Sequence, residues 1–442
     1  MLKTIGGDVL IVTAKQTKGN GRSSSHVVDF NNGSYTASLR IWWSGSTEIS
    51  VRVASFIENY CLRDKAVEKF GNQVFTMENG WGIRGLFVTS QGEREYTPCG
   101  PTAYMYGYDK LCNFTLINDG MSWYCGKPKR HGIYCEDIYS FGTGAFKTGD
   151  AKASEKVLLP TVSYFNDQVS INHTLMETNS KGNISCSERS SSQSWTEIDA
   201  YPSGYWLEGQ WHFVKCFSSC VPTIKSYREC LKNKTVYFFG DSTIRNYFEF
   251  FARSILENDF SKKSLRDGLG KGRTYHSRTT YSNFGITTAY LKHEMPFHNP
   301  DFPPNGITSF PSELKKLSNS DIPDDKLIIV VGYHTHFQAY PINVYKQRIH
   351  ELAKALEQLI KRKPKVKLFY KGPHVCHDDT RWFDNRLSLI YQDIVKETFQ
   401  HLWDNVTYLD TWSVTATHGN SNLHPSHEIF DSQIQQLMAF VC

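Results

Sequence analysis

The chain has 442 residues, and its 49 Lys and Arg against 44 Asp and Glu give a formal net charge of +5. A net positive charge this small on so long a chain does not indicate a surface that binds nucleic acid, so we exclude a nucleic-acid binder. Hydrophobic residues at 40% and charged residues at 21% suit a globular protein of two or three domains. The longest apolar run beside a strand covers residues 327–331, far short of the roughly 20 residues that cross a bilayer, so no membrane span is expected.

The first sixty residues have the pattern of β-structure. Residues 30–33 form a turn signal, because Asn-Gly accepts positive φ. Residues 35–41 and 49–53 then alternate between apolar and polar side chains, and the short Ser-Gly-Ser connection between them predicts a hairpin. Two or three strands do not make a stable sandwich alone. Further strands therefore come either from residues that precede this chain or from later in the sequence.

Cysteines are concentrated in the front half of the chain. Nine of the 11 lie between Cys61 and Cys230, and the CxxC pairs of a zinc ribbon are absent, which predicts disulfides rather than bound metal. The odd total leaves one free or intermolecular thiol. A polar stretch over residues 178–194 predicts an exposed linker. The disulfide candidates are Cys99, Cys112, Cys125, Cys135, Cys186, Cys216, Cys220 and Cys230, and the first four alone allow three pairings.

Six Asn-x-Ser/Thr sequons agree with a secretory location, either the Golgi lumen or outside the cell. We expect glycans at Asn32, Asn113, Asn172, Asn183 and Asn405, and we set Asn233 aside because it lies beside a predicted buried strand. Residues 1–12 lack the shape of a signal peptide. We therefore expect that a signal or anchor region is missing from this chain; cytosolic residence with reduced thiols is the alternative.

From residue 201 the pattern changes to that of an α/β domain. Short apolar strands are predicted at 236–239, 326–331, 366–370 and 406–409, and helices at 242–256, 344–360, 387–402 and 434–441. Continuous apolar strands that alternate with helices predict a parallel sheet with helices on both faces. Active residues then lie at the carboxyl ends of the strands.

Two residues at such positions indicate acyl chemistry. Ser242 follows a strand in Gly-Asp-Ser and opens a helix, whose free N–H groups can stabilise an oxyanion when the hydroxyl attacks an ester carbonyl. The alternative is that Asp241 or Ser242 only caps the helix. His424 lies in the loop before the closing helix and can accept the proton from Ser242. The alternative is a surface or capping histidine, one among 16.

These motifs resemble the neurexophilin and PC-esterase domain (NXPE) family. The resemblance rests on residues 236–249, 332–337 with Pro341, and 422–425, and in the front half on residues 5–8, 29–35 and the spacing of Cys99, Cys112, Cys125 and Cys135. It implies a partial, immunoglobulin-like β-sandwich over residues 1–98 and a Cys-rich segment with a linker over 99–200. Residues 201–442 are then an α/β/α SGNH-like (PC-esterase) domain.

The resemblance implies that Ser242 is the nucleophile and His424 the base. The wider PC-esterase superfamily has Asp-x-x-His at the second site, whereas this chain has Ser421 three residues before His424. The third triad member is therefore missing from its usual place. Asp410, at the end of strand 406–409, is the candidate substitute, and its alternative role is to cap the following turn.

Three further residues are candidates for oxyanion or substrate contacts. His336 stands where SGNH enzymes place an Asn after a central strand, and Asp241 belongs to the Gly-Asp-Ser motif. Arg245 could hold a glycan carboxylate or an oxyanion, or it could form an ordinary ion pair on the helix surface. The pairs His334-x-His336 and His424-x-x-His427 have a spacing that zinc sites use. No third ligand accompanies them, since residues 376–379 are far along the chain, and we expect no metal.

The leading hypothesis is a carbohydrate-active O-acyl (acetyl) esterase or O-acetyltransferase. Water as the acceptor gives hydrolysis, and a sugar hydroxyl gives transfer. The resemblance implies a glycan or glycoprotein substrate, with sialic acid as one candidate, no required cofactor, and acetyl-CoA as a candidate acyl donor. The alternative is a secreted neurexophilin-like binding or signalling protein whose esterase fold does not catalyse. The missing Asp at position 421 favours this alternative, whereas the intact Gly-Asp-Ser and His-Pro segments favour the enzyme.

Overall fold

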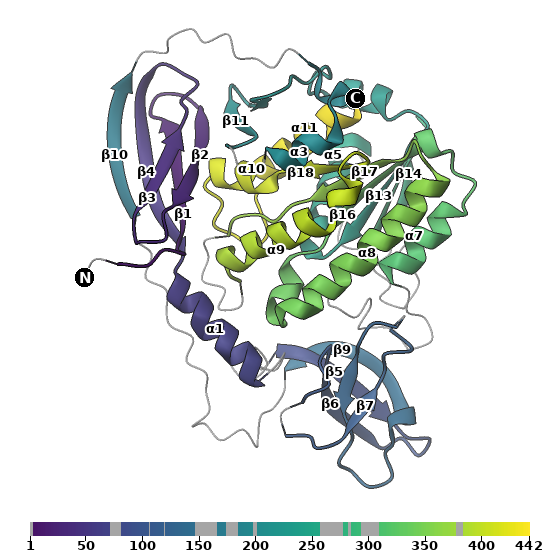
Figure 1. Cartoon of the computed structure of the whole chain (residues 1–442). Coiled ribbons are helices and arrows are strands. Elements are labelled where there is room, and N and C mark those ends of the chain that lie inside the picture. Colours follow the sequence, from purple (N-terminus) through teal and green to yellow (C-terminus); the bar gives the residue numbers. More distant parts are fainter. Residues whose placement is uncertain are drawn as a thin grey trace.

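The computed structural model describes residues 3–70, 81–105, 107–118, 120–145, 166–173, 184–197, 201–256, 277–281, 284–292, 309–376 and 383–442. These residues form three β-sheets. Figure 1 shows a long antiparallel sheet on one side, a small antiparallel sheet at the far end of helix α1 (Ile57–Phe70), and a mainly parallel sheet surrounded by helices. No helix in these ranges is long and apolar enough to cross a membrane.

The back half of the chain is an α/β domain, as predicted. Its strands follow the order β14 (Ser277–Tyr281), β15 (Ile286–Lys292), β13 (Thr235–Gly240), β16 (Leu327–Gly332), β17 (Lys367–Lys371) and β18 (Val406–Leu409). The strands from β15 to β18 are parallel, and β14 is an antiparallel edge strand. In chain order the parallel strands lie as 2-1-3-4-5, which places a topological switch point beside β13.

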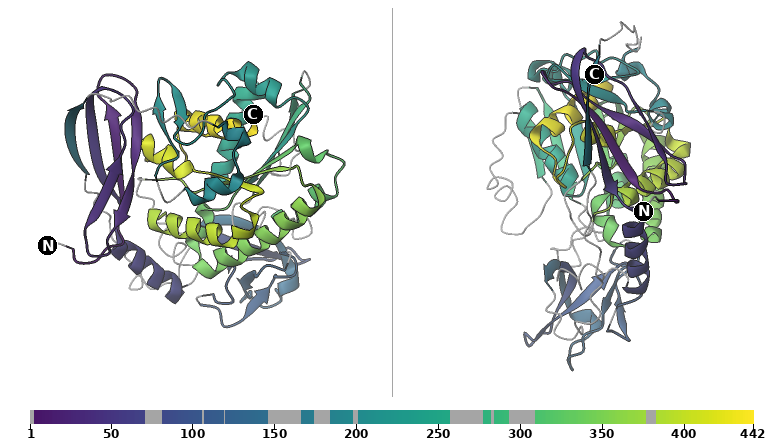
Figure 2. Two further views of the ribbon diagram at one scale, coloured as in Figure 1. Left: turned by 45° about the horizontal axis from the view of Figure 1, so that its top comes forward. Right: turned by 90° about the vertical axis from the view of Figure 1, so that its left-hand side faces the viewer.

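Helices cover both faces of this sheet, and each face has its own core (Figure 2). One face packs against α4 (Ile224–Cys230), α5 (Ser242–Leu256) and α11 (His427–Val441). The other packs against α3 (Ser191–Thr196), α7 (Phe310–Ser318), α8 (Ile342–Arg362) and α9 (Asn385–Thr398). Three-residue 3-10 helices cover Cys186–Glu188, Asp324–Lys326 and Gln400–Leu402, and a longer one covers Thr335–Ala339; another, Cys135–Asp137, precedes β9 (Ile138–Ala145) of the small sheet. The helices predicted from the sequence are all present, although the closing helix begins at His427 rather than at 434.

The linker predicted at 178–194 is wrong in its described part, because Ser191 begins α3. The reason is Trp195, which is fully buried among the aromatic side chains of the parallel sheet. Its indole Nε1 donates to the carbonyl of Val406 at 2.6 Å. The serine-rich composition therefore belongs to a short helix that is anchored by one tryptophan, not to a loop.

The long antiparallel sheet takes strands from three regions of the chain. Its order is β10 (Asn166–His173), β4 (Gly45–Ser55), β1 (Val9–Gln16), β2 (Arg22–Asp29), β11 (Gly204–Leu207) and β12 (Gln210–Phe213), with β3 (Tyr35–Leu39) also paired to β2. Residues from later in the sequence thus supply three of its strands. The predicted hairpin between 35–41 and 49–53 is wrong, because β3 pairs with β2 across the Asn-Gly turn whereas β4 pairs with β1 and β10.

The described strands of the front part form this one sheet (the front sheet), and the expected immunoglobulin-like sandwich is not confirmed. Some of its buried side chains pack on the α/β domain: Val9, Ile11 and Ala54 contact Val375 and Ala416. Trp206 and Trp211 of the β11–β12 hairpin likewise pack on Val414 and Ile429. The apolar face that a sandwich would cover is therefore covered by α10 (Thr411–Thr417), α11 and the segment after β17.

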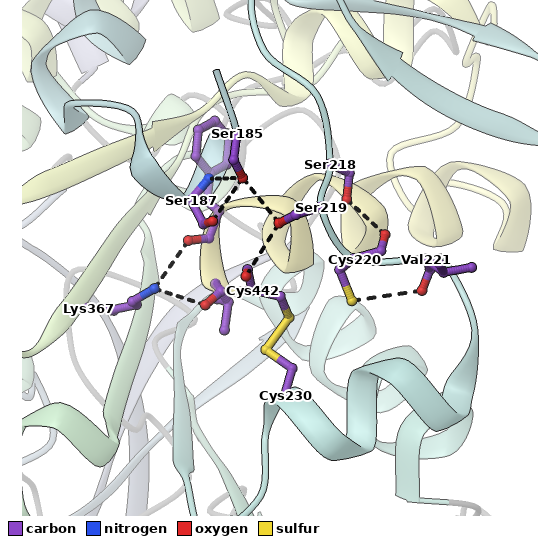
Figure 3. The surroundings of a disulfide bond; sticks show 11 residues. Ser185, Ser187, Ser218, Ser219, Cys220, Val221, Cys230, Lys367 and Cys442 are labelled. Carbon is purple, nitrogen blue, oxygen red and sulfur yellow. Dashed lines mark hydrogen bonds between the residues drawn. A yellow bond between two sulfur atoms is a disulfide. The ribbon is translucent and has the colours of Figure 1, made fainter. Parts of the chain in front are cut away.

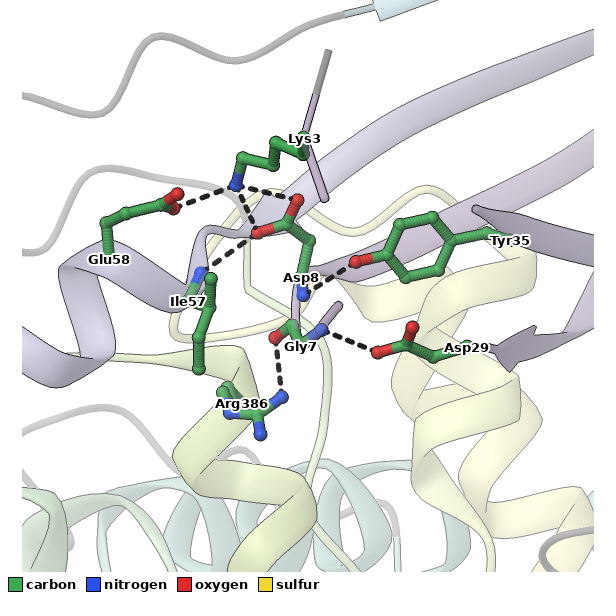
Figure 4. Close-up of polar contacts among 8 residues, drawn as sticks. All are labelled: Lys3, Gly7, Asp8, Asp29, Tyr35, Ile57, Glu58 and Arg386. Atoms are coloured by element: carbon green, nitrogen blue, oxygen red, sulfur yellow. Dashed lines mark hydrogen bonds and ion pairs between the residues drawn. The ribbon is translucent and has the colours of Figure 1, made fainter. Parts of the chain in front are cut away.

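Two sequence motifs of the front half meet at the junction with the α/β domain (Figure 4). Asp8 accepts hydrogen bonds from Lys3 Nζ at 2.7 Å and from the backbone N of Ile57 at 3.0 Å, at the start of α1. Its own backbone N donates to Tyr35 Oη at 3.0 Å. Gly7, at φ +102°, donates to Asp29. The segments 5–8 and 29–35 are therefore two halves of one junction.

The small sheet contains β5 (Trp81–Val88), β6 (Arg94–Gly100), β7 (Leu111–Asn113), β8 (Tyr124–Gly126) and β9 (Ile138–Ala145). Its core is stapled by the disulfides Cys99–Cys125 and Cys112–Cys135. The domain boundary expected between residues 98 and 99 falls inside β6, so the sheets divide the chain elsewhere. The Cys-rich segment begins with β5 in spatial terms, because β5 pairs with both β6 and β9.

Two more disulfides join Cys186 to Cys216 and Cys230 to Cys442. Figure 3 shows the second, which ties the end of α4 to the last residue of the chain; Lys367 Nζ nearby donates to the carbonyl of Val441 at 2.8 Å. The expectation that Cys220 is disulfide-bonded is wrong, because Cys442 takes Cys230 and leaves Cys220 as a thiol, like Cys61 and Cys376.

Of the expected glycan sites, Asn32, Asn113 and Asn405 are exposed. Asn172 lies on β10 with its side chain outside the described part, and Asn183 is outside the described residues. Asn233, which we set aside, is also exposed and has φ +58° at the turn before β13. Three expected acceptors are therefore accessible in the structure.

Candidate active site

The carboxyl ends of β13 and β16 lie side by side, with Gly240 opposite Gly332. A Cβ at Gly240 would come within 2.2 Å of Ile244 Cγ1, and one at Gly332 within 2.7 Å of Ile244 Cδ1. The two glycines therefore let the first turn of α5 approach the sheet closely. Ser242, 9% exposed, opens this helix at the switch point, where open α/β sheets bind ligands.

Asp241, between β13 and α5, has a buried carboxylate that accepts several hydrogen bonds. Oδ1 accepts from the backbone N of Thr243 at 2.8 Å and from its Oγ1 at 2.7 Å, and Oδ2 accepts from the backbone N of Thr335 at 3.1 Å. Burial opposes ionisation, but His336 and the Thr243 hydrogen bonds outweigh it and hold the pKa of Asp241 below its ordinary value. A carboxylate repels an oxyanion, so the structure gives Asp241 a positioning role: it joins α5 to the loop after β16.

Two further titratable groups are buried at the same edge. Lys371, the last residue of β17, is 4% exposed, and burial lowers its pKa to about 8 although the attraction of Asp241 acts in the opposite direction. His334 has Nε2 2.9 Å from Ser388 Oγ, and burial lowers its pKa to about 3. The edge thus combines an anionic Asp241, a cationic Lys371 and a neutral His334. Groups perturbed in this way are concentrated at functional sites.

His424 lies in a loop that is held by the segment after β17. Asn420 Nδ2 donates to the carbonyl of Val375 at 2.6 Å. His374 Nε2 lies 2.9 Å from the carbonyl oxygen of Leu423, and because this oxygen only accepts, Nε2 carries the proton. Burial lowers the pKa of His374 well below its ordinary value, so the ring stays neutral. His374 therefore fixes the residue that immediately precedes His424.

The ring of His424 contacts the helix that Ser242 opens. His424 Nδ1 lies 3.3 Å from Asn246 Nδ2. Asn246 is four residues after Ser242 on α5, and residues at this spacing share one face of a helix. Burial lowers the pKa of His424, and the positive charge of Arg245 lowers it further. His424 is therefore neutral near pH 7, as a general base must be.

Arg245 and His336 both face the same region. Arg245 Nε lies 3.5 Å from Glu249 Oε1, one turn along α5, so the helix-surface ion pair that was the alternative for Arg245 is present. Its charge still reaches His424, because it lowers the pKa of that ring. His336, half-buried in the 3-10 helix Thr335–Ala339, interacts electrostatically with Asp241 and His424.

Asp410 directly follows β18, as predicted, but its carboxylate caps α10. Oδ1 accepts from the backbone N of Ser413 at 3.0 Å, the Ser413 hydroxyl donates to Oδ2, and the backbone N of Ser203 lies 3.4 Å from Oδ2. These are the contacts of a helix cap. The alternative role named for Asp410 therefore describes its position, and the side chain found beside His424 Nδ1 is Asn246.

Among the described residues, no group of three or more His, Cys, Asp or Glu side chains is placed to hold a metal ion. The His334-x-His336 pair is not on a strand, because β16 ends at Gly332. His334 is instead bonded to Ser388 and Thr335. Residues 377–379, which the sequence singled out together with Cys376, lie outside the described residues.

Sequence reasoning missed three residues of this region. Asn246 carries a local signal, since its spacing from Ser242 places both on one helix face. Lys371 carries a weaker one, a lysine that closes an apolar strand. His374 carries none, because its partner Leu423 lies far along the chain and only the folded structure joins them.

Residues 211–442, more than half of the chain, match the NXPE family member 4-like, C-terminal domain. The match spans the parallel sheet, Ser242, Asn246 and His424. It confirms, at the level of the family, the resemblance that the sequence motifs indicated. The chain belongs to the NXPE family.

Proposed function

We propose that this protein is a serine O-acyl esterase or O-acetyltransferase that acts on glycans, with an SGNH-like (PC-esterase) active site. One observation carries the proposal: Ser242 opens α5 at the switch point, and His424 is held against the same helix by Asn246, one turn along. A serine at a helix start with a neutral histidine on the same face is the arrangement that nucleophilic acyl transfer needs.

In the mechanism, the Ser242 hydroxyl oxygen attacks the acyl carbonyl while His424 Nε2 accepts its proton. The backbone N–H of Ser242 is the candidate main-chain donor to the oxyanion, since the N–H of Thr243 donates to Asp241, and His336 is the candidate side-chain donor. The C–O bond of the ester then breaks, and the leaving alcohol takes the proton from His424. Water or a sugar hydroxyl next attacks the acyl-enzyme, and His424 takes and returns a proton in the same way.

Asn246 supplies the orientation that a triad carboxylate usually gives. For Nε2 to be a base, Nδ1 must carry the ring proton, and that proton needs an acceptor. A 180° rotation of the Asn246 carboxamide about its Cβ–Cγ bond exchanges Oδ1 and Nδ2. Oδ1 then lies 3.3 Å from His424 Nδ1, where it accepts the ring proton. The Cys-His-Asn arrangement of papain-like proteases uses an amide oxygen in this role.

The glycan substrate is inferred from the family, as are sialic acid as one candidate and acetyl-CoA as a candidate acyl donor. Four disulfides agree with an oxidising compartment, so we place the protein in the secretory lumen or outside the cell. Exposed Asn32, Asn113 and Asn405 are the glycan acceptors that fit this location.

The second candidate function is a secreted binding protein whose esterase fold does not catalyse. The observation that favours it is the place of Asp410, which caps α10 and so leaves no carboxylate assigned to His424. The two candidates differ in whether Ser242 is nucleophilic.

A fluorophosphonate probe tests this difference. We expect covalent labelling of the intact protein at Ser242, loss of labelling in Ser242→Ala, and slow labelling in His424→Ala. Ser309→Ala is the matched control, because Ser309 also caps a helix, α7, through its side chain. Absence of labelling in the folded wild-type protein, or unchanged labelling of Ser242→Ala, would leave the binding protein as the better proposal.

A further inference from the structure

A cavity of about 300 Å³ lies at the front sheet, near the place where β11 pairs with β2. Residues of β2, of the stretch 38–42 and of the stretch 201–215 line it, and none of the residues named above for the Ser242 mechanism does. Its volume is at the lower end of the range for small-molecule sites. It is therefore large enough for one or two sugar rings.

The lining is cationic. Arg40 and Lys215 line it, whereas none of the described residues in its wall is Asp or Glu. Ser38 adds a hydroxyl group, whereas Ser23 Oγ donates to the Arg40 carbonyl and Ser24 Oγ is hydrogen-bonded to Thr417 Oγ1. Two cations without an acid beside them attract an anion, and the Ser38 hydroxyl suits a ligand that carries hydroxyl groups of its own.

Aromatic rings hold both cations in place. The Arg40 guanidinium lies 4.3 Å from the centre of the Trp42 ring, and Trp42 stacks on Tyr205 with ring centres 4.4 Å apart. Lys215 Nζ lies 4.8 Å from the centre of the Tyr201 ring. Cations that are fixed on aromatic faces lose less side-chain freedom when they bind a ligand.

We propose that this cavity binds an acidic sugar unit, whose carboxylate or sulfate is neutralised by Arg40 and Lys215. The site requires two distant parts of the chain, since Arg40 and Trp42 follow β3 and Tyr201 and Lys215 flank β11 and β12. It is independent of whether Ser242 is catalytic.

Ligand-observed NMR titration of the intact protein tests the site with three matched sugars: methyl glucuronide, glucose 6-sulfate and neutral methyl glucoside. We expect one or both acidic sugars to bind at least tenfold more tightly than the neutral one, and their binding to weaken between 50 and 500 mM NaCl. Whichever acid binds more tightly identifies the acidic group. Equal binding of all three, or binding of none, overturns the proposal.

Variants locate the binding. Lys215→Gln and Arg40→Gln should each weaken the acidic sugar at least fivefold, Lys215→Arg should restore it, and Lys225→Gln, at an exposed lysine on α4, should leave it unchanged. Ser242→Ala should bind the sugar like the wild type, which separates this site from the proposed catalytic one. Wild-type affinity in both Lys215→Gln and Arg40→Gln would refute the assignment.

Discussion

The orientation of His424 by Asn246 gives a quantitative prediction. Asn246→Ala removes the side chain that lies 3.3 Å from Nδ1 among the described residues, at an exposed site. A neutral hydrogen bond contributes a net ~1 kcal/mol, and a wrong imidazole tautomer costs up to ~10⁴ in rate in a serine triad. Since water can partly replace an exposed partner, we expect kcat to fall about 10- to 100-fold while KM stays constant.

Asn246→Asp should change how activity depends on pH. A carboxylate at this position also accepts the Nδ1 proton, and its negative charge raises the pKa of His424 because it stabilises the protonated ring. In the wild type, burial and Arg245 lower this pKa from 6.5, so activity should fall only below that pH. The base acts when neutral, so a raised pKa moves the acid limb of the profile to higher pH.

The assay is hydrolysis of p-nitrophenyl acetate between pH 4.5 and 8.5, with kcat and KM measured separately. Asn422→Ala is the control, because Asn422 is an exposed asparagine in the same loop as His424. A wild-type kcat and an unshifted acid limb in both Asn246 variants would show that Asn246 does not orient the ring. A wild-type rate in His424→Ala would show that His424 is not the base for Ser242.

Arg245, Asp410 and the disulfides of the small sheet give three further predictions. Arg245→Gln removes a positive charge that lowers the pKa of His424, so the acid limb should move to higher pH; an unmoved limb contradicts the contact. Asp410→Asn weakens the cap of α10 and should lower stability by ~1–2 kcal/mol in urea unfolding without changing kcat, whereas a large loss of kcat would return Asp410 to the triad. Mild reduction should open residues 81–145 to protease before the α/β domain, because two disulfides staple a small core there; equal resistance of both parts counts against this.

The α/β half could be predicted from the sequence because its signals are local. Apolar runs such as 327–332 are buried on both faces, and helices such as α8 have an apolar stripe at helical spacing. Strands β14 and β15 were missed because Thr-rich segments such as Ser277–Tyr281 lack a continuous apolar run. The partners of β4 could not be predicted, because its alternation fits any neighbouring strand and β10 lies more than a hundred residues away.

The residues of the candidate site also differ in whether a local sequence signal or a contact between distant segments defines them. Ser242 and His424 could be named as candidates because each lies in a short motif beside a predicted strand or helix. For Asp410 the sequence left both a triad role and a capping role open, because a position at a strand end does not tell whether a carboxylate faces the neighbouring helix or a catalytic ring. His374 and Lys371 depend on contacts between distant segments, so their roles are visible only when the carboxyl edge of the sheet is assembled.

The buried charges beside Ser242 allow a last prediction that separates structural from functional roles. Lys371→Met removes a buried positive charge that attracts the Asp241 carboxylate, so we expect it to lower the free energy of unfolding. In the double variant Asp241→Asn/Lys371→Met both charges are gone, so the total loss should be smaller than the sum of the single losses. Urea unfolding of the four proteins gives the coupling, and additivity within ~0.5 kcal/mol would show that the two groups are not paired. We expect the double variant to label slowly with the fluorophosphonate, because the weakened contact to Thr335 N no longer holds the loop after β16 against the start of α5. Normal labelling in that variant would mean that the pair serves the fold alone.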